Sequence, residues 1–252
     1  MTTFARRRTR ALALGAAFLA AAPATAQELP PAEQLVQRYV EAVGGRDALL
    51  APQSTRTRGT FDIPAAGLGG DLVAVTARPG RMATHVTIPG LGVIRSGFDG
   101  THGWSLDPMT GARLLSGAEL ETMRESANPL MMVRDPSLFQ TMETVERTEM
   151  AGEPCYRVRT VTLSGREGSD CYHVETGLLV AQVATQESPM GSTVVTTYLS
   201  EYRPFGGVLM PTKMVQDLGM MQQNITITGV EFDVVEEAEL AAPAEIHALM
   251  GH

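Results

Sequence analysis

The segment GFDGTHGWSLDPMTGARLL, residues 97 to 115, shows in miniature how the whole chain is built. Asp99-Gly100 is a strong signal for a two-residue hairpin turn, and residues 107–111 have the composition of a second tight turn. The residues between and after these turns, 101–106 and 112–115, are predicted strands. The segment therefore indicates short antiparallel strands joined by tight turns.

A two-residue turn at this place also predicts which side chains face each other. It puts Arg95 opposite Trp104, close enough for the guanidinium to stack on the indole. It places His102 over Gly97, where no side chain obstructs it, and directs Phe98 to the other face of the sheet. We expect one of these two faces, carrying either Trp104 or Phe98, to meet a cavity.

The same two-residue period extends in both directions from this segment. Further strands are predicted at 57–63, 71–77, 82–88, 92–98, 141–150, 154–163, 170–175, 178–186, 192–203, 207–217 and 221–233. Helical spacing instead appears from Ala32 to the break at Gly44-Gly45 and in a short tail from Pro243. A helical stretch also interrupts the strands at 116–142, where Asn128-Pro129 and Asp135-Pro136 break it into short pieces.

An antiparallel set of about eleven or more strands must close or stack to protect its edges. We therefore expect a mainly β fold with a few helices. The predicted architecture is one strongly curved, unclosed β-barrel, with helices covering the concave side. Residues 27–252 are expected to form a single domain, in which the segment 116–142 acts as a lid.

The N-terminus has the features of a secretory signal peptide. Four arginines precede an apolar stretch, residues 11–22, that is too short to span a bilayer, and Ala24-Thr25-Ala26 matches a cleavage site. An uncleaved anchor helix is the alternative, but the stretch is short and ends at Pro23. We expect residues 1–26 to be removed and the mature protein to reside in the periplasm, with no transmembrane segment.

Charge excludes two classes of partner. Removing those four arginines from the 20 basic residues leaves 16 against 28 acidic ones, a formal charge of −12. Nucleic acids and anionic membrane surfaces both require basic patches, so neither is an expected partner.

Cys155 and Cys171 are the only cysteines. An even pair in an exported protein favours a disulfide. However, centring the hairpin turn within residues 164–168 puts Cys171 opposite Val161, and then Cys155 lies about 20 Å away along the strand. Pairing therefore requires a different register, and the sequence leaves both states open.

The sequence shows no familiar catalytic or metal-binding motif. None of the five histidines has metal-ligand spacing, and nucleophile-elbow, Walker and dinucleotide signatures are absent. A hydrolase using Asp99, His102 and Asp107 is conceivable, but no nucleophile accompanies them, and turn chemistry accounts for both aspartates. We therefore expect no enzyme activity, no cofactor and no metal.

Methionine is abundant and aromatic residues are few, and several methionines cluster on the broken helical segment. Methionine adapts to variable apolar shapes, so these side chains either line a ligand cavity or fill an ordinary core. The candidate lining and lid residues are Phe98, Trp104, Met123, Leu130, Met131, Met132, Leu138, Phe139 and Met142.

Several stretches together resemble the periplasmic lipoprotein-sorting family typified by the lipoprotein carrier LolA. They are YVEAVGGRDAL, RTRGTFDIPAAGLGGDL, RPGRM, GFDGTHGWSLDPMTG, YHVETGLLV, LSEYRPFGGVLMPTKM and ITITGVEFDVVEEAEL. The resemblance spans nearly the whole mature chain, and its motifs are turns and strand ends. It implies an unclosed antiparallel barrel with a helical lid over an apolar cavity for acyl chains, and a shuttle that performs no chemistry.

Two functions follow as hypotheses. The first is a non-catalytic periplasmic carrier or binding protein for a lipid-modified protein, an acyl chain or another amphiphile. The second is a cell-envelope interaction module, or a peptidase-associated accessory domain, whose concave side is filled by its own side chains and which binds an envelope protein. Purification with bound lipid distinguishes the two.

Overall fold

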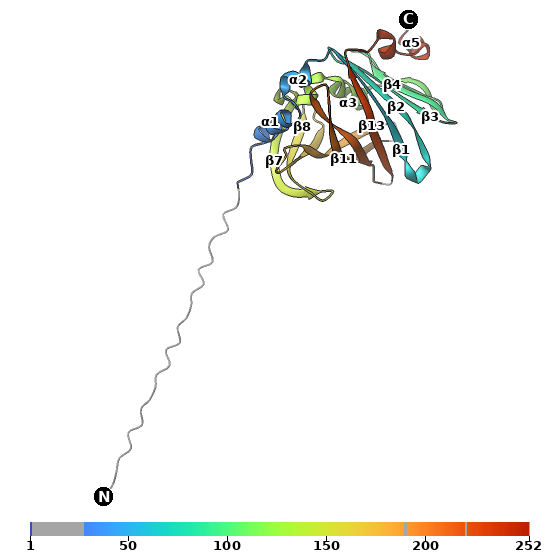
Figure 1. The fold of residues 1–252 in the computed structure, drawn as a ribbon. Coiled ribbons are helices and arrows are strands. Elements are labelled where there is room, and N and C mark those ends of the chain that lie inside the picture. Colours follow the sequence, from blue (N-terminus) through green and yellow to red (C-terminus); the bar gives the residue numbers. More distant parts are fainter. Residues whose placement is uncertain (2–27, 189–190, 220, 252) are drawn as a thin grey trace.

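The computed structural model describes Met1 and residues 28–188, 191–219 and 221–251. Apart from Met1, the predicted signal peptide lies outside these residues, so its cleavage stays a prediction. The described strands form one sheet of thirteen in the order β6-β5-β4-β3-β2-β1-β13-β12-β11-β10-β9-β8-β7 (Figure 1). Every printed neighbour pair is antiparallel, for example β1 with β13 and β7 with β8. The expectation of about eleven or more antiparallel strands is therefore confirmed.

The strands follow the predicted segments closely. The first six are β1 (Ser54–Ile63), β2 (Leu68–Ala77), β3 (Arg81–Ile88), β4 (Gly92–Phe98), β5 (Gly103–Asp107) and β6 (Gly111–Leu114). The other seven are β7 (Phe139–Met150), β8 (Glu153–Thr162), β9 (Glu167–His173), β10 (Leu179–Ser188), β11 (Gly191–Phe205), β12 (Val208–Asp217) and β13 (Gln222–Phe232).

The helices also lie where the sequence places helical spacing. They are α1 (Ala32–Ala42), α2 (Arg46–Leu50), α3 (Gly117–Ala127), α4 (Glu237–Leu240) and α5 (Ala244–Met250), with short 3₁₀ turns η1 (Pro64–Ala66), η2 (Pro129–Val133) and η3 (Pro136–Leu138). Pro129 and Pro136 each open a new 3₁₀ turn because proline has no backbone N–H to continue the preceding helix. In the part of the chain that the structure describes, none of the helices is long and apolar enough to cross a membrane.

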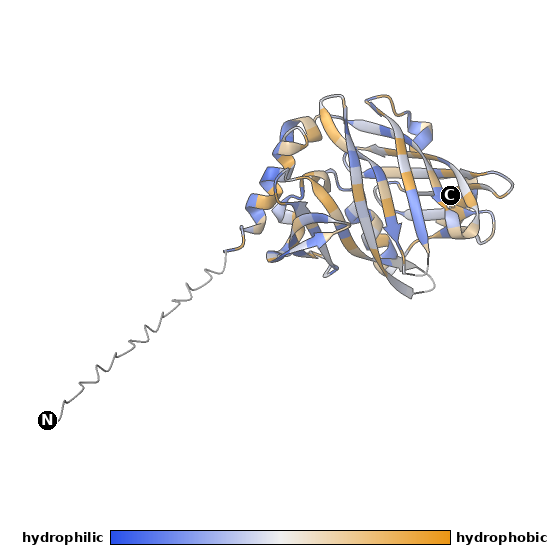
Figure 2. Ribbon diagram, turned by 60° about the horizontal axis from the view of Figure 1, so that its bottom comes forward, coloured by the Kyte–Doolittle hydropathy of each residue, from blue (hydrophilic) through white to orange (hydrophobic). Residues whose placement is uncertain are grey.

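The sheet curves strongly and stays unclosed, as expected. Helix α3 contacts β4 and β5 near one edge and also β10, which lies seven positions from β4 in the sheet. One helix reaches such distant strands only if the sheet wraps around it, so α3 lies on the concave side. The edge strands β6 and β7 are not paired with each other. Hydrophobic and hydrophilic residues alternate along the strands (Figure 2), as expected when the two faces differ in surroundings.

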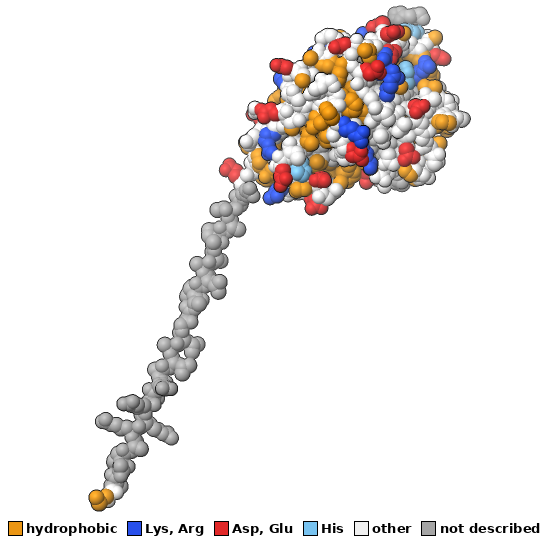
Figure 3. Space-filling model, in the orientation of Figure 1, with side chains coloured by type: hydrophobic (Ala, Val, Ile, Leu, Met, Phe, Trp, Pro, Cys, Tyr) orange, Lys and Arg blue, Asp and Glu red, His pale blue; other side chains and the backbone are white. Residues whose placement is uncertain are grey.

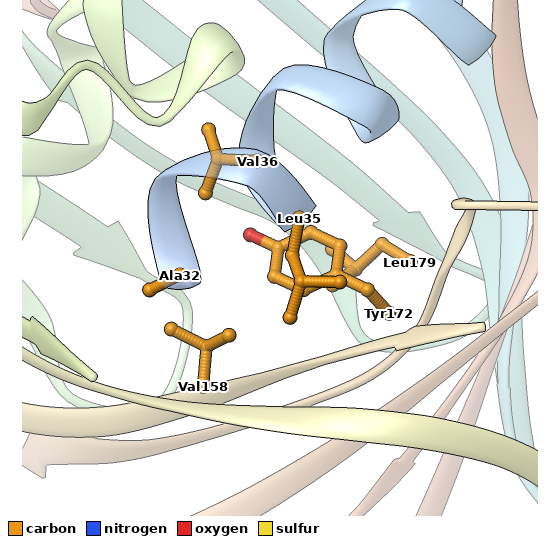
Figure 4. Packing of buried hydrophobic residues seen from close by; sticks show 6 residues of the cluster. All are labelled: Ala32, Leu35, Val36, Val158, Tyr172 and Leu179. Carbon is orange, nitrogen blue, oxygen red and sulfur yellow. The ribbon is translucent and has the colours of Figure 1, made fainter. Parts of the chain in front are cut away.

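Helix α1 closes one end of the concave side. Its apolar stripe carries Leu35 and Val36, which are buried with Val158 of β8 and Tyr172 of β9 (Figure 4). The ring of Tyr39 follows one helical turn later and lies 5.8 Å from the ring of Tyr172. This end of the barrel is therefore filled by the protein's own side chains.

The C-terminal helices cover the opposite, convex face beside β2 to β6. Leu240 of α4 and Ile246 of α5 are buried with Val75, Ala83 and Trp104. Figure 1 shows α5 at the end of the molecule away from α1. The apolar residues of this face thus form a second core outside the barrel.

A disulfide joins Cys155 of β8 to Cys171 of β9, with 5.5 Å between the Cα atoms. The hairpin turn is centred on Ser164, two residues earlier in the chain than expected. Cys171 pairs with Arg157 and not with Val161, so Cys155 lies only two residues further along the same face. The expected separation of about 20 Å was wrong because the register was shifted by four residues.

Candidate functional site

A hollow of about 350 Å³ lies on the concave side, between α3 and η2 on one side and strands β7 to β12 on the other. We call it the polar hollow. It is defined by the side chains Thr160, Asp170, Gln182, Thr197 and Gln216 on the sheet, and by Thr122, Ser126 and Arg134 on the segment from α3 to η3 (residues 117–138), which we call the covering segment. Met131, Phe139 and Val195 are among the apolar side chains in its wall.

Strand register aligns the polar floor of the hollow. Asp170 pairs with Gln182, Gln182 with Thr197, and Thr197 with Gln216, so four neighbouring strands contribute one row. Cross-strand partners point to the same side of a sheet, which makes the row continuous across β9 to β12. In the next row Gly168 has no side chain, and a Cβ there would lie 3.5 Å from the Thr160 hydroxyl. The glycine therefore leaves that hydroxyl accessible from the hollow.

An ion pair lies at the end of this row. Arg134 follows η2 with a left-handed backbone (φ 48°), and its Nε lies 2.9 Å from Oδ2 of Asp170. The same carboxylate accepts hydrogen bonds from the Tyr172 hydroxyl at 3.1 Å and from Nε2 of Gln182 at 3.0 Å. Burial alone would lower the pKa of Arg134, but the carboxylate of Asp170 raises that pKa above its usual value. The guanidinium therefore stays charged, and its contact with Asp170 joins the covering segment to the sheet.

The other charged groups around the hollow are paired as well. Glu125 of α3 accepts a hydrogen bond from Nε of Arg166 at 3.0 Å and one from the Ser164 hydroxyl at 2.6 Å. Burial raises the pKa of Glu125, but the hydrogen bonds from Ser164 and Arg166 outweigh it and hold the pKa below its usual value. Glu167 pairs with Arg159 at 3.0 Å. The charged side chains that line the hollow are therefore all paired, and the groups left to contact a ligand are neutral.

The concave side of β13 to β4 carries a group of apolar side chains in contrast. Ile94 pairs with Val86, and Val86 with Leu72, which places these three half-buried side chains in one row. Phe61 pairs with Ile225 in the next row. We call these five residues the apolar wall. They point to the same face as Phe98, because Ile94 and Phe98 are four residues apart on one strand.

The hairpin register predicted for the opening segment was wrong by two residues. The loop contains four residues, because Asp99 Oδ1 accepts hydrogen bonds from the backbone N–H groups of both Thr101 and His102. Trp104 therefore lies opposite Gly97 and not Arg95, and the expected stacking of Arg95 on the indole is absent from these pairs. A Cβ at Gly97 would lie 2.5 Å from the indole, so glycine is required there.

This register also decides the two aromatic candidates. Trp104 is wholly buried on the convex face beneath α4 and α5, so it does not line the hollow. Phe98 points to the concave face, where the guanidinium of Arg124 on α3 lies 5.9 Å from the centre of its ring. Phe98 is buried beneath the covering segment and is not part of the hollow's wall.

The remaining candidates separate into several places. Met131 and Phe139 line the hollow, and Met131 and Leu138 line a neighbouring cleft that also contains Leu163. Met132 lines a different, smaller cleft beside α2. The others do not appear in these walls. Leu130 packs against the buried cluster that contains Leu49 of α2, Met142 packs against the buried cluster that contains Leu35 of α1, and Met123 is half-buried. A ligand-facing role for the methionines stays a prediction.

The polar cluster of the opening segment forms turns. Asp107 Oδ1 accepts hydrogen bonds from the N–H groups of Met109 and Thr110, as its turn position predicted. Partial burial raises the pKa of Asp99, but hydrogen bonds from the backbone of His102 and Thr101 hold it below its usual value. Across residues 28–188, 191–219 and 221–251, no three histidine, cysteine or acidic side chains are grouped to hold a metal ion.

Sequence reasoning missed the polar hollow. A signal was present, since Asp170, Gln182 and Thr197 occupy inward positions of strands whose pattern otherwise places apolar residues there. Four polar residues more than ten positions apart in the chain give no local motif, however. Their alignment appears only when the register of each strand pair is known.

No family model matches the sequence, and no curated protein matches it either. Solved structures do match the fold. A DUF1329 family protein from Desulfovibrio piger has a TM-score of 0.57 at 12% identity over 84% of this chain and 100% of that one. A LolA superfamily protein from Nitrosomonas europaea has a TM-score of 0.57 at 9% identity over 85% of this chain and 99% of that one.

An outer membrane lipoprotein-sorting protein domain from Vibrio parahaemolyticus matches with a TM-score of 0.53 at 9% identity, over 82% of this chain and 94% of that one. At these identities the comparison is one of fold. The fold that the family resemblance implied is therefore confirmed: this chain has the same unclosed, helix-covered sheet as these LolA-type structures.

Proposed function

We propose that this protein is an exported, non-catalytic carrier or binding protein of the periplasm, and that its ligand is an amphiphile such as a lipid-modified protein. The observation that carries the proposal is the division of the concave side. The apolar wall lies on β1 to β4 and β13, and the polar hollow lies on β8 to β12. A molecule with an apolar chain and a polar end matches both chemistries.

The energy of such binding comes mainly from the apolar chain. Burial contributes about 0.8 kcal/mol per CH₂, so ten carbons gain roughly 8 kcal/mol before the entropic costs of association. Leu72, Val86 and Ile94 are only half-buried in the protein alone, so their remaining surface is available to a ligand. The LolA-type folds named above support this proposal, because one of those proteins is described as lipoprotein-sorting.

The covering segment supplies a route for entry. Helix α3, η2 and η3 are short pieces separated at Pro129 and Pro136, and the ion pairs Arg134–Asp170 and Arg166–Glu125 attach them to the sheet. Of these pieces, α3 buries only Ala127, so it separates from the sheet at lower cost than a long helix packed on a large apolar face, whereas Val133 and the Arg134–Asp170 pair keep η2 in place.

The test is lipid binding by protein purified without detergent. Native mass spectrometry should show a co-purified amphiphile, and a fluorescent fatty acid should bind. Val86→Asn, on the apolar wall, should weaken the fatty acid about five- to thirtyfold through the loss of one buried aliphatic contact. Thr87→Asn, the exposed neighbour on the other face, is the matched control. Absence of any lipid together with no fatty-acid binding would refute the proposal.

A second candidate is the interaction module with a filled core. The observation in its favour is the α1 end of the barrel, where Leu35, Val36 and Tyr172 already occupy the concave side (Figure 4). Figure 3 shows hydrophobic side chains gathered in the middle of the face in view, with charged groups mostly around them. Under this candidate the protein binds an envelope protein partner and no fatty acid, so the same experiment distinguishes the two.

A further inference from the structure

The polar hollow differs chemically from the cavity expected for acyl chains alone. Its floor carries the amides of Gln182 and Gln216 and the hydroxyls of Thr160 and Thr197, and α3 adds Thr122 and Ser126 above them. We infer that the hollow binds the uncharged, hydroxyl-bearing head group of the ligand, with a sugar ring as the chemical class that fits it. This inference rests on the proposed function and names the polar end of the amphiphile.

The charged side chains of the polar hollow are already paired with one another or with neighbouring residues. Each charged side chain that lines the hollow has an opposite charge beside it within the protein: Arg134 has Asp170, Arg166 has Glu125, and Glu167 has Arg159. A phosphate head group would require a free cation, and an ammonium group a free carboxylate. Placing either charge in the hollow without a partner carries a large desolvation cost. An uncharged head group carries no such cost.

Several polar side chains on the floor of the hollow have unused hydrogen-bonding capacity. Among the described residues, no intramolecular hydrogen bond engages the side chains of Thr160, Thr197 or Gln216. Gln182 uses its Nε2 on Asp170, which leaves its carbonyl oxygen available. Threonine hydroxyls both donate and accept, and a glutamine amide presents one donor group and one acceptor. Sugar hydroxyls likewise donate and accept, so each can pair with any of these groups.

The volume of the hollow and the apolar side chains in its wall suit a single sugar ring. A volume of about 350 Å³ falls at the small end of the range for small-molecule sites, which suits a single ring better than an extended oligosaccharide. Phe139 and Met131 in the wall provide apolar surface for the C–H face of such a ring. The row of polar groups crosses four strands of a rigid sheet, so the ligand meets groups held in fixed positions.

The experiment compares amphiphiles that share one eight-carbon chain and differ in the head group. Octyl glucoside, octyl phosphate and octyltrimethylammonium are titrated below their micelle concentrations by calorimetry, with N-octanoylglycinamide as an uncharged control that has no sugar. We expect octyl glucoside to bind at least tenfold more tightly than either charged compound. Equal or tighter binding of octyl phosphate would overturn the inference, and so would equal binding of N-octanoylglycinamide, because that result would assign the hollow to an amide.

Variants locate the head group. Gln216→Leu and Thr197→Val should each weaken octyl glucoside about two- to tenfold, the effect of one neutral hydrogen bond, and should leave octyl phosphate unchanged. Gln222→Leu, an exposed glutamine on the neighbouring strand, is the matched control. Circular dichroism and the melting temperature verify that each variant folds.

The two proposals fail in different ways. If all three compounds bind equally and Val86→Asn weakens all of them, the amphiphile carrier stands and the head-group inference is wrong. If none of them binds, the proposed function itself is wrong, and the inference is lost with it.

Discussion

Removing the carboxylate of Asp170 should be among the most destabilising single changes in this protein. Asp170→Asn leaves the guanidinium of Arg134, whose side chain is only 15% exposed in the wall of the hollow, without its counter-charge. Breaking a buried ion pair by removing one partner costs about 3–5 kcal/mol. Domains of this kind are stable by about 5–15 kcal/mol, so we expect the variant to lose about a fifth or more of its free energy of unfolding.

Urea unfolding at neutral pH measures this loss. Trp104 is the only tryptophan and is wholly buried, so its fluorescence reports unfolding from a site away from the substitution. The disulfide is kept oxidised throughout. Arg134→Met alone should also be strongly destabilising, since it leaves the carboxylate of Asp170 without its cation.

The double variant R134M/D170N decides the interpretation. It contains neither charge, so its destabilisation should be smaller than the sum of the two single losses by at least about 2 kcal/mol. A cost below about 1 kcal/mol for Asp170→Asn, or simple additivity in the double variant, would mean that water screens the pair. A charged head group would then be screened by water in the same way, and the hollow would not favour a neutral one.

Three further outcomes are expected. Gly97→Ala should destabilise by about 1–3 kcal/mol because its Cβ would collide with the facing indole, whereas Gly229→Ala, with open space around it, should be tolerated. The double variant C155A/C171A opens a loop spanning 16 residues and should lose about 3 kcal/mol; an unchanged melting temperature would contradict this. The pKa of Glu125 is depressed by folding, so its stabilisation is present above the unfolded pKa and is lost as pH falls through the folded pKa. Glu125→Gln should therefore lower stability by about 1 kcal/mol at pH 7 and progressively less below about pH 4.5, as followed by thermal unfolding.

Local turn chemistry was predictable from the sequence, but the lengths of the turns were not. Asp107 forms its predicted side-chain turn because the carboxylate and the backbone groups that it caps are only two or three residues apart. Asp99 also caps its turn, yet the loop is two residues longer than Asp-Gly normally specifies. A register shift of two residues leaves each side chain on the same face of the sheet and changes only the residue opposite it. The prediction therefore assigned Phe98 and Trp104 to the correct, opposite faces, but it assigned Arg95 the wrong cross-strand neighbour.

The candidate site was less predictable than the fold. Of the nine proposed lining residues, Met131 and Phe139 lie in the wall of the hollow, and Trp104 lies on the far side of the sheet. An apolar lid was expected, but α3 presents Thr122 and Ser126 to the hollow. Hydrophobicity along the chain identifies which residues are apolar, but it does not show which of two cores each one joins.

The positions of the strands, the turns between them and the breaks at Pro129 and Pro136 can be predicted from the sequence alone, because these features follow from interactions among residues a few positions apart. The disulfide, the Arg134–Asp170 pair and the row from Asp170 to Gln216 appear only once the chain is folded. Each depends on strand register or on the docking of the covering segment. Those are set by packing over the whole sheet, where a shift of two residues preserves every hydrophobic face and replaces every partner.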